Sequence, residues 1–82
     1  MKKILFTSAT CGPCFGLKKR IETEKLTIDT LEHNDENRAE FEKYGIRAVP
    51  RLVLEDCHGA FVVIQGGDDI VRAIKSSDEE LS

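Results

Sequence analysis

Hydrophobic and polar positions along the chain fall into segments that predict strands and helices in alternation. Lys2 to Thr7 (KKILFT) carries the short apolar run of a buried strand. Leu26 to Leu31 (LTIDTL) alternates apolar and polar residues with the period of two that is typical of a half-buried strand. Residues 51–55 and 60–65 predict two more strands, and the turn residues 56–59 between them predict a hairpin.

Helix signals occupy the gaps between these strands. A first helix is expected to start around residues 11–13, where a proline suits the first turn, and to end near Lys25. A second helix is expected to follow an N-cap at Asn34 or Asp35 and to stop at Gly45. The chain therefore alternates the two kinds of element.

The predicted order is β-α-β-α-β-β-α, in one domain over residues 1–76. The first β-α-β unit should be parallel with a right-handed crossover, whereas the hairpin must be antiparallel. An α/β fold with one four-stranded mixed sheet and helices on both faces follows. The last helix is expected to begin at Asp68 or Asp69, and residues 77–82 form an acidic tail that is expected to fray.

Composition narrows the classes of partner. The chain has 82 residues, of which 40% are hydrophobic and 33% charged, which is enough for one small core. Its net charge of −3 argues against a nucleic-acid partner, which needs a basic face. No stretch reaches the ~18 apolar residues that span a bilayer, and the N-terminus lacks the apolar segment of a signal peptide. We expect a cytoplasmic monomer without a membrane partner.

The three cysteines are an odd number, so they cannot form a closed disulfide framework. Cys11 and Cys14 have C-x-x-C spacing, and Cys57 stands alone in the predicted turn. In a reducing cytosol such a pair is catalytic or metal-binding more often than structural. A zinc site needs a second pair, which is absent, and the adjacent Cys57 and His58 are poorly placed to chelate one ion. No metal or bound cofactor is expected.

The segment Cys11-Gly12-Pro13-Cys14 lies where a strand leads into a helix. Free backbone N–H groups and the positive end of the helix dipole favour a thiolate there, and a thiolate is the nucleophile of disulfide exchange. Cys11, at the helix edge, is predicted to attack, and Cys14, inside the first turn, to resolve. Pro13 is expected to stiffen the turn between the two sulfur atoms.

The Cys-Gly-Pro-Cys segment after a first strand resembles the active site of thioredoxins. Residues 43–50 (KYGIRAVP) resemble the thioredoxin segment that carries a cis-proline, here Pro50. The short length and the Gly-Gly-Asp-Asp segment at 66–69 look more like glutaredoxins. This resemblance to the thioredoxin superfamily covers the chain nearly completely and implies a thioredoxin fold and a dithiol–disulfide oxidoreductase. The pattern departs from thioredoxins at Thr10, in place of Trp, and at Leu5, in place of a buried Asp.

The resemblance also implies residues that bind the substrate. A cis Val49–Pro50 bond would turn the backbone of Val49 toward Cys11, where it can pair with an extended substrate segment. If the Pro50 loop faces Cys11, Arg51 is expected either to stabilise the thiolate or to select acidic substrates; the alternative is that its side chain points away. The remaining candidates, which would form a docking surface before the last helix, are Gly66, Gly67 and Asp68.

The expected substrates are proteins that contain disulfide bonds, and the expected electron donor is a thioredoxin reductase. Ser8 and Ala48 stand at two positions that resemble glutathione contacts, and neither has the usual residue type, so only residues 66–69 retain a contact. A small charged ligand needs several convergent groups, which disfavours glutathione as donor. The alternative is a glutathione-dependent glutaredoxin. A redox-inert binding module and an iron–sulfur carrier are disfavoured by the intact cysteine pair and by Pro13, respectively.

Overall fold

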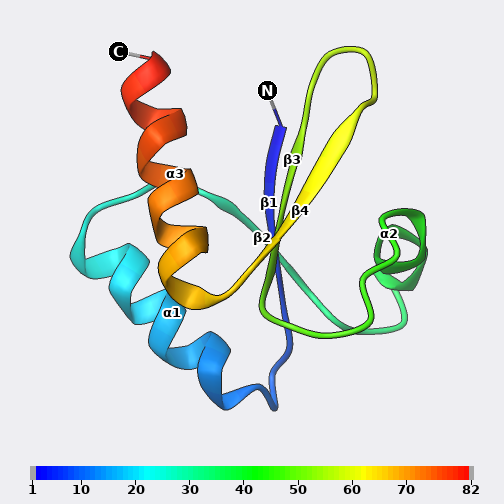
Figure 1. Ribbon diagram of the computed structural model, residues 1–82. Helices are drawn as coiled ribbons and strands as arrows, with labels where there is room; N and C mark the ends of the chain where they lie inside the picture. Colours follow the sequence, from blue (N-terminus) through cyan, green and yellow to red (C-terminus); the bar gives the residue numbers. More distant parts are fainter. Residues whose placement is uncertain (1, 82) are drawn as a thin grey trace.

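The computed structural model describes residues 2–81, of which 77–81 are described without their side chains. Along the chain it contains β1 (Lys2–Thr7), α1 (Gly12–Thr23), β2 (Asp29–Glu32), α2 (Arg38–Lys43), β3 (Arg51–Glu55), β4 (Phe61–Gln65) and α3 (Gly67–Leu81) (Figure 1). The predicted order of elements is confirmed. The acidic tail expected at residues 77–82 lies outside the residues whose side chains are described.

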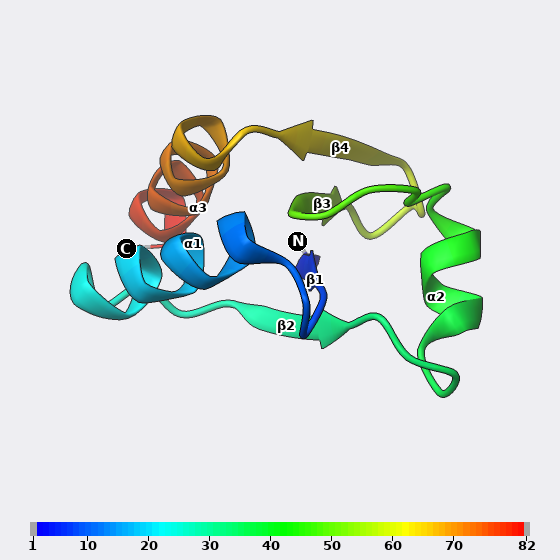
Figure 2. The ribbon, with the colours of Figure 1, turned by 90° about the horizontal axis from the view of Figure 1, so that it is seen from below.

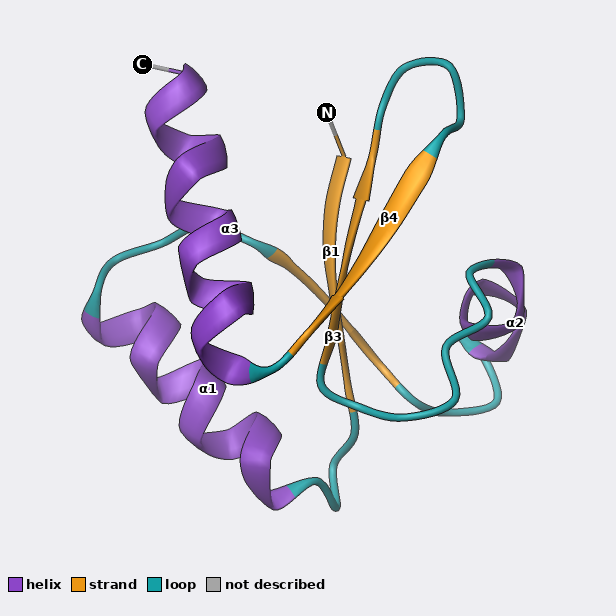
Figure 3. Cartoon of the chain, viewed as in Figure 1, coloured by secondary structure: helices purple, strands orange, loops and turns teal. Residues whose placement is uncertain are grey.

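The four strands form one mixed sheet in the order β2-β1-β3-β4 (Figure 2), and the strands are drawn in orange in Figure 3. β1 pairs in parallel with β2, and β3 pairs antiparallel with both β1 and β4. In the β1–β3 ladder, Phe6 lies opposite Arg51. This register brings the loop that follows β1 beside the loop that precedes β3, which is where the chemistry-bearing residues lie.

Helices cover both faces of the sheet, as predicted: α1 and α3 lie on one side and α2 on the other (Figure 2). Successive side chains of β1 point to opposite faces. Leu5 therefore packs on the side of α1 and α3, whereas Ile4 and Phe6 pack on the side of α2. The first core consists of Leu5, Leu17, Ile21, Leu52, Ile70, Val71 and Ile74. The second consists of Ile4, Phe6, Phe41, Tyr44 and Val53.

Aromatic packing holds α2 on the sheet. The helix has 6 residues, too few to be stable alone in water. The ring of Phe6 meets Phe41 edge-on with centroids 4.8 Å apart, and meets Tyr44 at 5.8 Å. Such aromatic pairs contribute to the stability of the fold in addition to the contribution from the apolar area that they bury. Packing against β1 thus fixes α2, and with it the start of the loop that leads to β3.

The starts of β2 and α2 lie later in the chain than the sequence predicts. β2 begins at Asp29 instead of Leu26, because its pairing with β1 starts where Asp29 meets Ile4. Leu26 and Ile28 are half-buried against the first core without joining the strand. The alternation of apolar and polar residues that predicted a longer strand therefore reflects the burial of one face of this segment. It does not show where the pairing with β1 begins.

The second helix begins at Arg38 and not directly after Asn34 or Asp35. The side-chain Oδ1 of Asn34 accepts a hydrogen bond from the backbone N–H of Asn37 at 2.9 Å. This bond stabilises a turn over residues 34–37. Asn34 thus caps a turn that precedes the helix.

Candidate active site

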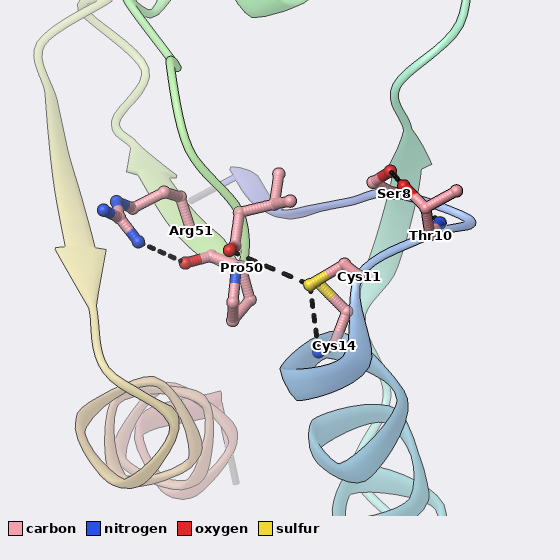
Figure 4. Close-up of a disulfide and its surroundings, with 7 residues drawn as sticks. Ser8, Thr10, Cys11, Cys14, Pro50 and Arg51 are labelled. Atoms are coloured by element: carbon pink, nitrogen blue, oxygen red, sulfur yellow. Dashed lines mark hydrogen bonds between the residues drawn. A yellow bond between two sulfur atoms is a disulfide. The ribbon is translucent and has the colours of Figure 1, made fainter.

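Cys11 and Cys14 form a disulfide at the start of α1 (Figure 4). Their Cα atoms are 5.3 Å apart, within the range of protein disulfides. In a helix, residues three apart lie on the same face, so the C-x-x-C spacing brings both sulfur atoms together without distorting the helix. The structure therefore brings the predicted pair together.

Cys11 is the N-cap residue of α1. Its backbone is extended, with φ −86° and ψ 108°, and its Sγ accepts a hydrogen bond from the backbone N–H of Cys14 at 3.1 Å. Pro13 lies in the first turn, where a missing N–H leaves no helical bond unmade. Once the disulfide is reduced, the same N–H group and the helix dipole favour negative charge on Cys11 Sγ.

The two sulfur-bearing residues differ in exposure. Cys14 is only 1% exposed, whereas Cys11 is half-buried at the protein surface. Gly12 and Pro13 are exposed, and a Cβ added at Gly12 would meet nothing within 4 Å. The space in front of Cys11 is therefore open, and Cys11 is the sulfur that a large molecule can reach.

The loop before β3 reaches the disulfide. The Val49–Pro50 peptide bond is cis, which confirms that prediction. The carbonyl oxygen of Val49 lies 3.8 Å from Cys11 Sγ, a contact that Figure 4 draws as a dashed line from Cys11. On the other side, the carbonyl of Ser8 accepts a hydrogen bond from the backbone N–H of Cys11 at 3.2 Å. Cys11 thus sits between the two loops that the β1–β3 register brings together.

Arg51 is not part of this arrangement. Its Nη1 donates a hydrogen bond to the carbonyl oxygen of Pro50 at 2.8 Å, and the guanidinium points away from the sulfur atoms (Figure 4). Of the roles considered for Arg51, the structure supports the one in which its side chain points away from the disulfide.

The Gly66–Asp68 segment forms the turn from β4 into α3. Gly66 has φ +91°, a conformation that side-chain-bearing residues rarely adopt, and its carbonyl accepts from the N–H of Ile70 at 2.9 Å. α3 consequently starts at Gly67, earlier than expected. Asp68 Oδ1 pairs with Arg20 Nη1 of α1 at 2.6 Å. The structure thus places Asp68 as a link between α3 and α1.

Sequence reasoning missed a cavity beside the disulfide. It has a volume of about 220 Å³ and is lined by Ser8, His33, Phe41 and the loop 46–49. The imidazole of His33 meets the ring of Phe41 edge-on with centroids 4.9 Å apart. The only sequence signal for this cavity was the position of Arg47 just before Ala48-Val49-Pro50.

The other candidate features lie apart from this site. Cys57 is free and exposed in the hairpin turn, where Asp56 Oδ1 accepts from the N–H groups of His58 and Ala60. Within the described residues, no group of three or more His, Cys, Asp or Glu side chains is placed to hold a metal ion. Across that same part of the chain, no helix combines the length and the apolar character needed to cross a membrane.

Comparison with known proteins decides the family. No protein-family model matches the chain. A protein described as a probable thioredoxin from Archaeoglobus fulgidus is 34% identical, and the match covers 92% of this chain and 90% of that protein. The chain belongs to the thioredoxin family. As a member of this family it is a thiol–disulfide oxidoreductase.

A solved thioredoxin shows the same fold. The crystal structure of thioredoxin f from spinach chloroplast, in its short form, superposes on this thioredoxin with a TM-score of 0.74 at 22% identity. The match covers 93% of this chain and 74% of the spinach chain. The predicted thioredoxin fold is confirmed.

Proposed function

We propose that this thioredoxin reduces disulfide bonds in other proteins by a two-step exchange at Cys11 and Cys14. The observation that carries the proposal is the difference in exposure: Cys11 is half-buried at the helix start, whereas Cys14 is 1% exposed. A folded substrate therefore meets the sulfur of Cys11 first. The helix N-terminus favours the thiolate form of that sulfur, which is the form that attacks disulfides.

In the first step, the Cys11 thiolate attacks one sulfur of the substrate disulfide. A bond forms between Cys11 and that sulfur, and the other substrate sulfur leaves as a thiolate that takes a proton from water. In the second step, the sulfur of Cys14 attacks Cys11 Sγ and its proton passes to the departing substrate sulfur. The substrate gains two electrons and two protons, and the Cys11–Cys14 disulfide forms.

The loop before β3 is proposed to hold the substrate during this exchange. The carbonyl oxygen of Val49 lies 3.8 Å from Cys11 Sγ, so an extended segment that pairs with the backbone of Val49 brings its own sulfur to Cys11. Pro50 fixes the direction of that backbone. Gly12 leaves the approach open, and Pro13 keeps the cysteines in one turn in both redox states.

A thioredoxin reductase is proposed as the electron donor that regenerates the dithiol. Gly66, Gly67 and Asp68 are the segment that resembles a glutathione contact, but the carboxylate of Asp68 already pairs with Arg20. Glutathione would have to compete with this pair for the carboxylate, which supports the reductase over glutathione. We place the cycle in the cytoplasm, where a reducing thiol pool suits a protein with a free, exposed Cys57.

Single cysteine substitutions test the roles. Cys11→Ser is expected to abolish reduction of insulin, and Cys14→Ser to accumulate a mixed disulfide with a target protein, visible as a mass increase that disappears with reductant. Cys57→Ser serves as the matched control and should behave as the unsubstituted protein. Trapping by Cys11→Ser, or equal residual activity in both active-site variants, would reverse or remove the assignment.

A second assay tests the donor. NADPH consumption is compared between thioredoxin reductase and the combination of glutathione with glutathione reductase, with one model disulfide as substrate. Faster turnover with the reductase is expected. Faster turnover with glutathione would identify glutathione as the electron donor in place of the reductase, and it would leave the roles of Cys11 and Cys14 intact.

A further inference from the structure

The cavity beside the disulfide, which we call the Arg47 pocket, shares two of its lining residues with the surroundings of Cys11. It is lined by Ser8, His33, Phe41 and residues 46–49. Two of its lining residues flank Cys11 directly: the carbonyl of Ser8 accepts the N–H of Cys11, and the carbonyl of Val49 lies 3.8 Å from Cys11 Sγ. A substrate whose sulfur meets Cys11 therefore lies against the mouth of this pocket.

The pocket is large enough for a side chain. Its volume of about 220 Å³ is several times the ~30 Å³ that one water occupies in the liquid. Phe41 and Ile46 give it an apolar wall, which suits the methylene groups of a bound side chain. The wall is fixed from behind, because Phe41 packs edge-on against Phe6 of the central strand β1.

The charge at the pocket comes from Arg47. Its side chain is exposed, and among the residues that the structure describes it forms no ion pair and no side-chain hydrogen bond. By contrast, the guanidinium groups of Arg20, Arg38 and Arg51 are each engaged by a carboxylate or a carbonyl within the protein. A guanidinium presents a planar fork of donors that matches a carboxylate.

The distance from Arg47 to the reacting sulfur fits a short substrate segment. Arg47 precedes Val49 by two residues, so the two lie at most about 7 Å apart along the backbone. An extended substrate covers the same distance with two residues. A side chain within two residues of the substrate cysteine therefore reaches the pocket while the cysteine lies at Cys11.

We propose that the Arg47 pocket binds an acidic side chain that flanks the reactive cysteine of the substrate protein, with Arg47 as the residue that determines this specificity. The inference rests on the proposed attack by Cys11 and names the substrate class of that site: proteins with Glu or Asp next to the disulfide cysteine. The carboxylate pairs with Arg47, and its methylene groups lie against Phe41 and Ile46.

Matched peptides test this preference in the reduced protein that carries both Cys14→Ser and Cys57→Ser, so that Cys11 is the one thiol left in the sequence. Each peptide carries one cysteine blocked by thionitrobenzoate. Attack by Cys11 joins the peptide sulfur to Cys11 and releases coloured thionitrobenzoate, which gives the rate directly. Glu is moved through the four positions within two residues of the cysteine, and a Gln peptide and a Leu peptide are made for each position. Every rate is divided by the rate of the same peptide with dithiothreitol, which removes its intrinsic reactivity.

We expect the Glu peptide to react about 1.4- to 5-fold faster than the Gln peptide in at least one position, the range given by an exposed ion pair. Arg47→Gln should abolish the preference, so that the Glu and Gln peptides react at equal normalised rates, and Arg47→Lys should keep part of it. Arg72→Gln is the control: Arg72 is exposed on α3, on the opposite face of the sheet, and its loss changes the net charge equally. The preference should shrink between about 0.01 M and 1 M salt as screening increases.

Equal normalised rates for Glu and Gln at every position would overturn the inference and leave the proposed function intact. So would a Leu peptide that reacts faster than Glu, or an Arg72→Gln variant that loses as much preference as Arg47→Gln. Release of no thionitrobenzoate from any peptide would overturn the proposed role of Cys11, and the inference with it.

Discussion

Phe41 is the position at which the structure predicts the largest loss of stability from one substitution on α2. Its side chain is 5% exposed and its ring meets both Phe6 and His33 edge-on. Removal of a buried aromatic ring costs about 3–5 kcal/mol, because the transfer of the ring from water and its contacts are both lost. A domain of 82 residues has a total unfolding free energy of about 4–12 kcal/mol.

We therefore expect Phe41→Ala to remove a quarter or more of the stability, or to unfold the protein. The assay is urea denaturation followed by far-UV circular dichroism. With a slope of about 1–3 kcal/mol per molar urea, the midpoint should fall by at least ~1 M.

Phe15→Ala is the matched control on α1. Phe15 is 73% exposed, so the same chemical change should alter the unfolding free energy by no more than about 0.5 kcal/mol. A loss below about 1 kcal/mol for Phe41→Ala, or an equal loss for both variants, would refute the assignment of Phe41 to the second core.

Three further predictions concern other parts of the fold. A double-mutant cycle on Arg20 and Asp68 should give a coupling of about 0.2–1 kcal/mol that falls as salt is added, since both side chains are largely exposed; a coupling that persists in concentrated salt would contradict an exposed pair. Gly59→Ala should destabilise by about 1–2 kcal/mol, because Gly59 has φ +87°, whereas Gly16→Ala in open space inside α1 should stabilise by about 0.5–1 kcal/mol; thermal melts that shift in the same direction would be inconsistent with these conformations. Cys57→Ser should leave insulin reduction unchanged within about threefold, because Cys57 lies exposed in the hairpin turn.

The strands whose bounds were predicted best from the sequence are those whose ends depend on neighbouring residues in the chain. β1 over Lys2–Thr7 and β3 over Arg51–Glu55 match the predicted bounds, because an apolar run ends at polar or turn residues in each case. β2 was expected three residues too early, since its start depends on where Asp29 meets Ile4 of another strand. Such a register is a long-range property that a local alternation does not contain.

The same distinction applies to the site. Cys11 and Cys14 were identified because their chemistry depends on four consecutive residues at a helix start. The Arg47 pocket is built from segments that are distant in the chain, and the packing of α2 on β1 brings Phe41 to them. The direction of the Arg51 side chain could not be predicted from the sequence either, because it depends on one hydrogen bond to the carbonyl oxygen of its neighbour Pro50.

The pairing of Phe6 with Arg51 links the geometry of the active site to the correct register of β1 and β3. Cys11 follows β1 and Pro50 precedes β3, so the ladder between these two strands sets the nucleophile and the loop relative to each other. A slip of one residue would shift the loop by about 3.3 Å and turn the side chains of β3 to the wrong face. A chain in the wrong register would therefore lose its core and its reactive geometry in a single step. Enzyme activity should consequently disappear along the same denaturation curve as the sheet, and the specific activity of a preparation measures its fraction of correctly paired molecules.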